Sequence, residues 1–220
     1  MPSHNYFTSS IGKKQITAVT GLGLVGFTAM HLAGNLLILV GADAFNAYGH
    51  ALVSNPLIYL AEAILLGMFV LHIAMAATVT VQNTAARGRR YYIKNRSGRG
   101  ETIASMTMPY TGVIMLIFII LHLINFKYGA HYETVVDGVV MRDLFKLVVE
   151  YFANPLYVAW YVFAMIALGL HTGHGLQSSL QTWGLNHPSY TPKVKMVSVA
   201  YGVLVAFGYS GLAIYCYFLN

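Results

Sequence analysis

Four histidines lie within long apolar stretches of this chain: His31, His72, His122 and His171. An imidazole ring carries one donor and one acceptor nitrogen when it is neutral, and neither nitrogen finds water inside a lipid bilayer. A histidine at that depth therefore serves as a metal ligand, a proton site or a partner in a helix–helix hydrogen bond. For one histidine alone the hydrogen bond is as good an interpretation as the ligand, so the pattern of all four has to decide.

The stretches that carry these histidines are long enough to cross a membrane. Of the 220 residues, 57% are hydrophobic and 9% are charged, whereas about a quarter of the residues are charged in soluble proteins. A spanning helix needs about 20 mainly apolar residues. We therefore expect an all-α bundle of five transmembrane helices that forms a single domain over residues 1–220. The expected spans are roughly 16–40, 57–81, 106–126, 156–176 and 195–219.

The basic residues between the spans predict the orientation of the chain. The segment 82–105 carries six Arg or Lys residues, and a lysine pair precedes the first and the fifth span, whereas the segment 41–55 carries none. Because cytoplasmic loops are enriched in positive charge, we expect the N-terminus in the cytoplasm and the C-terminus outside. The net charge of +6 then belongs to the membrane topology, and nucleic acid is not an expected partner. Residues 142–152 predict a short helix on the outer surface.

The spacing of the four histidines sorts them into two pairs by depth. His72 and His171 each follow by sixteen residues the proline of an Asn-Pro-Leu sequence that opens a span from the outer side. At 1.5 Å per residue, each lies about 24 Å into a core of about 30 Å. His31 and His122 are on spans that run the opposite way, about 20–25 Å from the cytoplasmic face. We expect the first two near the cytoplasmic side and the other two near the outer side.

Two imidazoles at one depth suit a haem iron better than a zinc ion. A structural zinc ion needs four ligands close together, whereas each predicted pair supplies two. Two neutral imidazoles on opposite faces of a flat ring complete a six-coordinate haem, and helix bundles hold cofactors between facing helices. The single cysteine, Cys216, and the absence of a Cys-x-x-Cys-His sequence exclude covalent haem and a multi-cysteine cluster within this chain. We predict two haems b that carry electrons.

A fifth histidine, His174, stands three residues after His171. On a helix this spacing places it about 4.5 Å closer to the cytoplasm and turns it by about 60°. We therefore predict that His171 is the iron ligand. His174 is in the right region to contact the edge or a propionate of the same haem.

Three glycines of the first span, Gly21, Gly23 and Gly26, match the dinucleotide fingerprint G-x-G-x-x-G. That interpretation fails because no strand precedes them and they lie inside a membrane span. Small residues let a helix approach a macrocycle or another helix closely. The sequence leaves both of these explanations open.

Polar residues near the expected outer pair suggest quinol chemistry. Glu62 lies six residues past Pro56, about 9 Å below the outer surface, and a carboxyl group at that depth can pass protons. We hypothesise that Glu62 takes part in proton transfer from a quinol, the alternative being a snorkelling or helix-bonded acid. Asn46, Tyr48 and His50, in the expected outer loop AFNAYGH, are candidate contacts of a quinone carbonyl, although ordinary loop polarity explains them nearly as well.

The sequences around the four ligands resemble those of a known family. The segments are TAMHLAGNLL, VLHIAMA, ILHLINF and LHTGHGLQSSLQTWGLNHPSYTP. They resemble the five-helix, di-haem cytochrome b anchor of succinate:quinone oxidoreductases, which include succinate dehydrogenases and quinol:fumarate reductases. The resemblance covers nearly the whole chain, and the last segment is its most specific part, followed by TGL before His31 and the FNAYGH sequence.

The resemblance implies partners and a place in the cell. It implies an iron–sulfur subunit and an FAD-binding flavoprotein subunit on the cytoplasmic side, where succinate and fumarate interconvert. It implies that His72 with His171 hold the proximal haem, that His31 with His122 hold the distal one, and that a quinone, usually menaquinone, reacts near the distal haem. It also implies the bacterial cytoplasmic (inner) membrane with its lipid bilayer and quinone pool, and it allows a dimer of the complex.

One position departs from part of this family. Some of its fumarate reductases carry a glutamate, thought to conduct protons across the membrane, two residues before the fourth ligand, and here that residue is Gly169. Either another group replaces this route or turnover is electrogenic, and the sequence leaves both open. Two other functions also fit the pattern: the cytochrome b anchor of a hydrogenase or formate dehydrogenase, and a haem-free five-span transporter.

Overall fold

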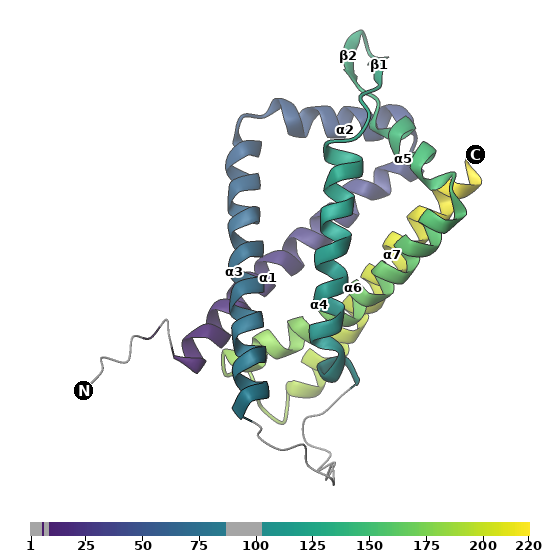
Figure 1. The fold of residues 1–220 in the computed structure, drawn as a ribbon. Helices are drawn as coiled ribbons and strands as arrows, with labels where there is room; N and C mark the ends of the chain where they lie inside the picture. Colours follow the sequence, from purple (N-terminus) through teal and green to yellow (C-terminus); the bar gives the residue numbers. More distant parts are fainter. Residues whose placement is uncertain (1–5, 7–8, 87–102) are drawn as a thin grey trace.

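Five long helices form the frame of the structure (Figure 1), a computed structural model that describes residue 6, residues 9–86 and residues 103–220. Each helix, with its short 3-10 or π-helical extension where it has one, contains a stretch long and apolar enough to cross a membrane. The predicted all-α transmembrane bundle is therefore confirmed. The helices are α1 (Ser10–Asn35), α3 (Leu57–Ala86), α4 (Ile103–His122), α6 (Pro155–Thr182) and α7 (Thr191–Phe218).

The two ends of the bundle differ in what they carry. The start of α1 and the end of α6 lie at one end, and α2 (Ala42–Ser54), α5 (Leu144–Phe152) and the C-terminus lie at the other (Figure 1). The six basic residues of the segment 82–105 occupy positions between 87 and 99, which are outside the described residues. The alternating directions of the spans agree with the predicted topology, and the sides of the membrane stay a prediction.

The helices α3 and α6 begin in the same way, as their shared Asn-Pro-Leu sequences predict. The Asn55 side chain accepts a hydrogen bond from Leu57 N at 3.0 Å, and the Asn154 side chain accepts one from Leu156 N at 2.9 Å. Such caps satisfy backbone donors that the first helical turn leaves free. Both helices extend beyond the predicted spans, because the polar residues that follow each apolar run are also compatible with a helix.

The expected outer loop with the sequence AFNAYGH is instead the helix α2, and that expectation was wrong. Its alanines and leucine favour a helix, and it buries Phe45 and Asn46. Gly41, at φ 137°, makes the change of direction from the preceding 3-10 helix (Leu36–Leu39) into α2, a conformation that glycine adopts readily. As a result, α2 crosses the end of the bundle that holds the C-terminus (Figure 1).

A small antiparallel hairpin, β1 (Glu133–Val136) and β2 (Val139–Arg142), is the only strand pair among the described residues, and it was not predicted. Asp137 and Gly138 join the strands with φ values of 49° and 78°, as Asp-Gly does in a tight two-residue hairpin turn. The helix expected over 142–152 is confirmed as α5, and the Asp143 side chain caps it by accepting from Lys146 N.

The helices α6 and α7 approach each other closely through glycines. A Cβ atom on Gly169 would lie 2.4 Å from the carbonyl oxygen of Gly202, and one on Gly202 would lie 2.5 Å from the carbonyl oxygen of Gly169. Small residues allow such close backbone approach in membrane helices. Gly169 is thus a packing residue of the α6–α7 contact, and a longer side chain does not fit there.

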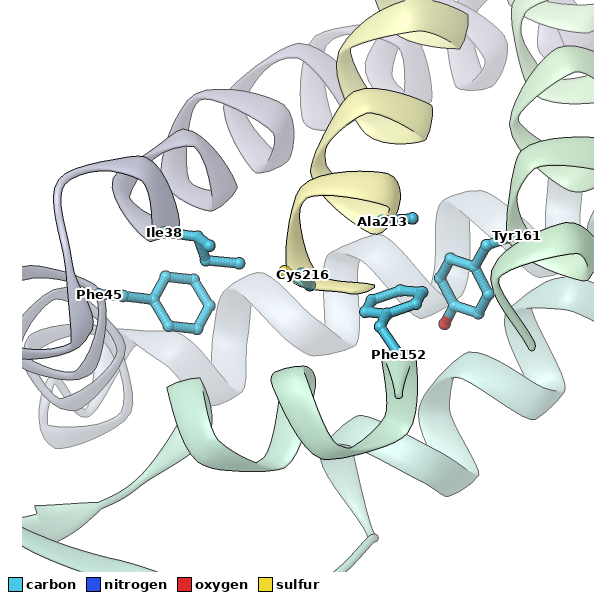
Figure 2. Packing of buried hydrophobic residues seen from close by; sticks show 6 residues of the cluster. All are labelled: Ile38, Phe45, Phe152, Tyr161, Ala213 and Cys216. Atoms are coloured by element: carbon cyan, nitrogen blue, oxygen red, sulfur yellow. The ribbon is translucent and has the colours of Figure 1, made fainter. Parts of the chain in front are cut away.

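Packing at the end of the bundle that α2 and α5 cover joins the ends of several helices (Figure 2). The buried cluster there is Ile38, Phe45, Phe152, Tyr161, Ala213 and Cys216. In addition, α7 is tied to α1 by two tyrosines: the hydroxyl of Tyr201 donates to the Val25 carbonyl at 2.6 Å and that of Tyr209 to the Thr28 carbonyl at 2.9 Å. The last helix, α7, thus packs against α6 and also bonds to α1.

Candidate functional site

The four histidines of the spans come together in the two predicted pairs. The ring centres of His31 on α1 and His122 on α4 are 5.9 Å apart. Those of His72 on α3 and His171 on α6 are 6.4 Å apart. The first pair lies toward the end of the bundle that α2 and α5 cover, because His31 is near the end of α1 and His122 is the last residue of α4. We call them the outer pair and the inner pair.

In the inner pair, threonine hydroxyl groups face one nitrogen of each ring. Thr111 Oγ1 lies 3.0 Å from His171 Nδ1, and Thr20 Oγ1 lies 3.3 Å from His72 Nδ1. Each hydroxyl also donates to a carbonyl of its own helix, four residues earlier, so its oxygen is an acceptor for the ring. The Thr17 carbonyl, 3.2 Å from His72 Nδ1, is a further acceptor.

These contacts decide which nitrogen of each inner ring remains for a ligand. A nitrogen that faces acceptors carries the proton, and the other ring nitrogen then has a free lone pair. Metal-bound histidines use this arrangement, in which a partner of the second nitrogen fixes the tautomer and the ring orientation. Both inner histidines are therefore held with Nε2 available as a ligand atom.

A repeat in the sequence builds this arrangement twice. The dipeptides Thr20-Gly21 and Thr111-Gly112 each stand eleven residues before a histidine of the outer pair. A Cβ atom on Gly21 would lie 3.1 Å from His72 Cε1, and one on Gly112 would lie 3.6 Å from His171 Cε1. Each threonine thus contacts an inner ring while its neighbouring glycine leaves room for that ring. The first Thr-Gly opens the TGL sequence before His31, and the equal spacing of the second from His122 is the sequence signal by which it could have been predicted.

The outer pair has aromatic neighbours. Tyr161 OH lies 3.0 Å from His122 Nδ1, and it accepts a hydrogen bond from Tyr157 OH at 3.4 Å. Phe118 stacks on His122 with ring centres 5.5 Å apart. In the same way, Phe27 stacks on the other ring of the pair at 5.3 Å. Sequence reasoning did not find Tyr161, because its role depends on how α6 packs against α4.

The backbone changes its helical form directly after His122. Residues Leu123–Lys127 form a π-helix, a form that is rare and frequent at functional sites. Asn125 in this turn donates to Tyr157 OH at 2.6 Å. The turn therefore joins α4 to the tyrosine chain that ends at the His122 ring.

Both pairs fit the axial ligands of a six-coordinate haem. If a metal–imidazole bond is about 2.0–2.1 Å long, as it is for zinc, two imidazoles on opposite sides of one ion have ring centres about 6 Å apart. The observed 5.9 Å and 6.4 Å agree with this separation. Among the residues that the structure describes, no three His, Cys, Asp or Glu side chains form a group that could hold a metal ion, so each pair offers two ligands and not four.

The other candidate residues have the following surroundings. Glu62 forms an ion pair with Lys127, the last residue of the π-helix, and both side chains are partly exposed. His50 lies 3.3 Å from the Ser54 hydroxyl on α2, and Tyr48 packs against Gly34. His174 is partly buried, three residues after His171 on α6. None of these residues joins the two histidine pairs directly by a hydrogen bond within the described parts of the chain.

Asn46 has a structural environment. Its amide nitrogen donates to Asp143 Oδ1 at 2.9 Å, and its amide oxygen accepts from Phe145 N at 2.9 Å. The residue is only 1% exposed. Because both ends of the amide are used to hold α2 against the start of α5, contact with a quinone would require these two bonds to break.

Comparison with known proteins gives two matches. Residues 86–209 match the family of succinate dehydrogenase/fumarate reductase transmembrane subunits. The chain is also similar to the succinate dehydrogenase cytochrome b558 subunit of Bacillus subtilis (strain 168), with 26% identity over 205 residues that make up 90% of this chain and 92% of that protein. No solved structure matches the chain.

Proposed function

The chain belongs to the family of succinate dehydrogenase/fumarate reductase transmembrane subunits, and on this premise we propose that its two histidine pairs hold two haems b. It is a multi-pass membrane-anchor cytochrome b subunit of the succinate dehydrogenase type. In our proposal His72 and His171 ligate the proximal haem iron, and His31 and His122 ligate the distal one. Together the two haems join a quinone to the soluble subunits.

The observation that carries this proposal is the set of acceptor atoms that face Nδ1 of the inner histidines. Acceptors at Nδ1 of His72 and His171 leave the Nε2 lone pairs for iron. A haem held by one histidine pair would supply a one-electron carrier without an open position for a substrate. The threonines orient the rings, and the glycines beside them leave space at the ring edges. Around the outer pair, the aromatic side chains exclude water.

We propose that the end of the bundle with the start of α1 and the end of α6 faces the cytoplasm. The lysines before the first and fifth spans support this orientation. A cavity of about 330 Å³, with Lys14 and Gln181 in its lining, lies at this end. Here the chain would meet an iron–sulfur subunit and, beyond it, the FAD-binding subunit. The membrane would be a bacterial cytoplasmic membrane, and a dimer of the complex is compatible with this arrangement.

The quinone, which we take to be menaquinone, would react at the outer end, near His31 and His122. Glu62 is our candidate for proton transfer there, and its ion pair with Lys127 ties it to the turn that follows His122. Glu62→Gln should slow quinol turnover while haem content is kept. Unchanged turnover with both haems present would show that Glu62 has no part in it.

A spectrum of the purified complex tests the proposed function. Dithionite-reduced minus oxidised spectra should contain b-type bands, and haem extraction should give two haems per chain. Succinate should reduce part of this absorbance when the flavoprotein and iron–sulfur subunits co-purify. A chain without any b-type absorbance would contradict the proposal, and haem that formate or hydrogen reduces, but succinate does not, would assign the chain to another complex.

A further inference from the structure

The hairpin β1–β2 leads into two consecutive residues, Arg142 and Asp143, whose side chains bond in different directions. It stands at the end of the bundle beside α2 and α5 (Figure 1). Val136 and Met141 are buried, so the hairpin is packed against the protein. The Asp143 N–H donates to the Tyr132 carbonyl at 2.8 Å and closes the hairpin. Because the hairpin is fixed in this way, the two side chains that follow it can hold other elements in place.

The Arg142 side chain bonds to the end of the turn that follows His122. Its Nη1 donates to the Lys127 carbonyl at 3.2 Å, and its Nη2 donates to those of Gly129 and Ala130 at 3.4 and 3.0 Å. Carbonyl groups at the end of a helix lack a partner within it and carry the negative end of its dipole. A guanidinium group suits such a place, because its donors form a rigid planar fork with a permanent charge.

The Asp143 side chain connects the same hairpin to the two short helices. Its Oδ1 accepts from Asn46 Nδ2 on α2 at 2.9 Å and from the Lys146 N–H of α5 at 3.0 Å. The amide oxygen of Asn46 accepts from the Phe145 N–H at 2.9 Å, so α2 and α5 are joined at this point. Arg142 and Asp143 therefore fasten the end of α4 to a frame made of the hairpin, α2 and α5.

The turn that is held in this way sets the surroundings of the outer pair. Asn125 donates to the hydroxyl of Tyr157 on α6 at 2.6 Å. Lys127 forms its ion pair with Glu62 on α3. A displacement of the turn would therefore act on the His122 ring, on the tyrosines beside it and on the partner of Glu62 together.

A glycine allows the turn to be as tight as it is. A Cβ atom on Gly129 would lie 1.9 Å from the Asn125 carbonyl oxygen, far inside van der Waals contact. Any other residue would therefore force the turn to open. Replacing Gly129 thus disturbs the turn without removing a charge or a side-chain hydrogen bond.

We propose that Arg142 and Asp143 are positioning residues of the outer pair, and that the hairpin is a clamp on the end of α4. The clamp fixes the orientation of the His122 ring and keeps Lys127 beside Glu62. When the clamp is loosened, the ring turns relative to its partner in the pair and the ion pair separates, while every iron ligand is still present. The inference rests on the proposed function wherever it concerns haem or quinol.

Arg142→Ala tests the clamp in the intact complex by electron paramagnetic resonance (EPR). The signal of a ferric haem with two imidazole ligands depends on the angle between the two rings, which is 89° for the outer pair. Arg142→Ala should change the outer signal and leave the inner one unchanged. Quinol turnover should fall about tenfold, because small displacements at a reacting site are costly. Asp143→Ala, which frees the hairpin from α2 and α5, should give the same changes.

Two further variants separate position from charge. Arg142→Lys keeps the charge but not the fork of donors, so it should restore only part of the signal and of the turnover. Lys146→Ala is the matched control, because it removes a positive charge at the same end of the bundle, where Lys146 Nζ lies 4.5 Å from the centre of the Tyr132 ring. It should leave the outer signal as in the wild type.

Gly129→Ala approaches the same turn without any change of charge. It should alter the outer EPR signal as Arg142→Ala does. By weakening the contact of His122 with Tyr161, it should also raise the midpoint potential of the outer haem by at least about 18 mV, which is a twofold change in a one-electron equilibrium. Gly211→Ala, where a Cβ meets nothing within 4 Å, is its control and should match the wild type.

Hydrogen exchange separates the clamp from the proposed function. The Tyr128 N–H donates to the Leu123 carbonyl at 3.0 Å, and this amide should exchange at least about tenfold faster in Arg142→Ala and Gly129→Ala, with or without haem. A wild-type complex without b-type haem would refute the proposed function, and the exchange rates alone would then decide about the clamp.

The inference is overturned if the turn in Arg142→Ala exchanges as slowly as in Lys146→Ala. It is also overturned if Arg142→Lys restores the wild type completely, if both haem signals change equally, or if Gly129→Ala leaves the outer haem unaltered. Should Arg142→Ala fail to assemble, Arg142→Lys and Gly129→Ala decide by the same measurements.

Discussion

The two histidine pairs are held in different ways. The inner pair is oriented by Thr20 and Thr111, one from each copy of a Thr-Gly repeat, and small residues lie beside its rings. The outer pair has stacked phenylalanines and, at His122, a tyrosine in a chain of three side chains. The contacts that orient the inner rings therefore come from a sequence motif that occurs twice. The contacts that orient the His122 ring come from the tertiary packing of α4 and α6.

The helices α3 and α6, which begin with the same Asn-Pro-Leu sequence, differ about one and a half turns further on. Tyr161 and Glu62 both stand six residues after the proline that opens their helices. Tyr161 bonds to His122, whereas Glu62 pairs with Lys127, and the His31 ring has no hydrogen bond among the described residues. The same position thus carries, on α6, a tyrosine that contacts a histidine ring and, on α3, a carboxylate in an ion pair.

Removing an inner ligand should have the largest effect. His72→Ala or His171→Ala should lower the haem content from two to one per chain, because one imidazole cannot replace two axial ligands. His174→Ala is the control and should keep both haems. Quantitative haem extraction from the purified complex gives the result, and loss of one haem in the His174 variant would contradict the ligand assignment.

Gly169→Ala should have the second-largest effect, and it should act on the inner pair. Its Cβ would lie 2.4 Å from the Gly202 carbonyl, so α6 must shift two residues before His171. Overpacking of this kind costs about 1–3 kcal/mol of folding free energy. Denaturation of the complex, followed by haem absorbance, should show the inner haem lost first. Gly175→Ala, where a Cβ meets nothing within 4 Å, should behave like the wild type, and equal losses would contradict the assigned contact.

Tyr161→Phe should change the outer haem and leave its content unchanged. If Nε2 of His122 held the haem iron, Nδ1 would donate to the Tyr161 oxygen, and this bond would make the imidazole more basic and favour the oxidised state. Losing a hydrogen bond worth about 1 kcal/mol should raise that midpoint potential by about 40 mV. Redox titration of the two haems measures this shift. A shift of the inner haem alone would place Tyr161 in the wrong pair.

The threonine variants act on the inner pair and should give the smallest shifts of midpoint potential. Thr111→Val removes the acceptor that faces His171 Nδ1, so the inner potential should rise. Thr20→Val should raise it less, because the Thr17 carbonyl still faces His72 Nδ1. The same redox titration separates the two variants. Equal shifts would indicate that the Thr17 carbonyl contributes nothing.

Sequence reasoning was most successful where the rise and direction of a helix determine the depth of a residue. The depths of His31, His72, His122 and His171 follow from helical rise and from the direction of each span, so the two pairs could be predicted. The helix α2 was missed because its polar residues resembled a loop, although they are used in packing against α5. The hairpin was missed despite Asp137-Gly138, and Tyr161 could not be found, since its contact with His122 exists only once α4 and α6 are packed.

The last helix has a consequence for how the protein is made. Synthesis runs from the N-terminus, so all four histidines leave the ribosome before α7, which carries none of them and fastens α6 to α1 through Gly202, Tyr201 and Tyr209. We expect α6 to be held less firmly against α1 until α7 is inserted. A cofactor would then enter between the histidines more easily before α7 is inserted. The end of translation would set the time at which this entry becomes slower.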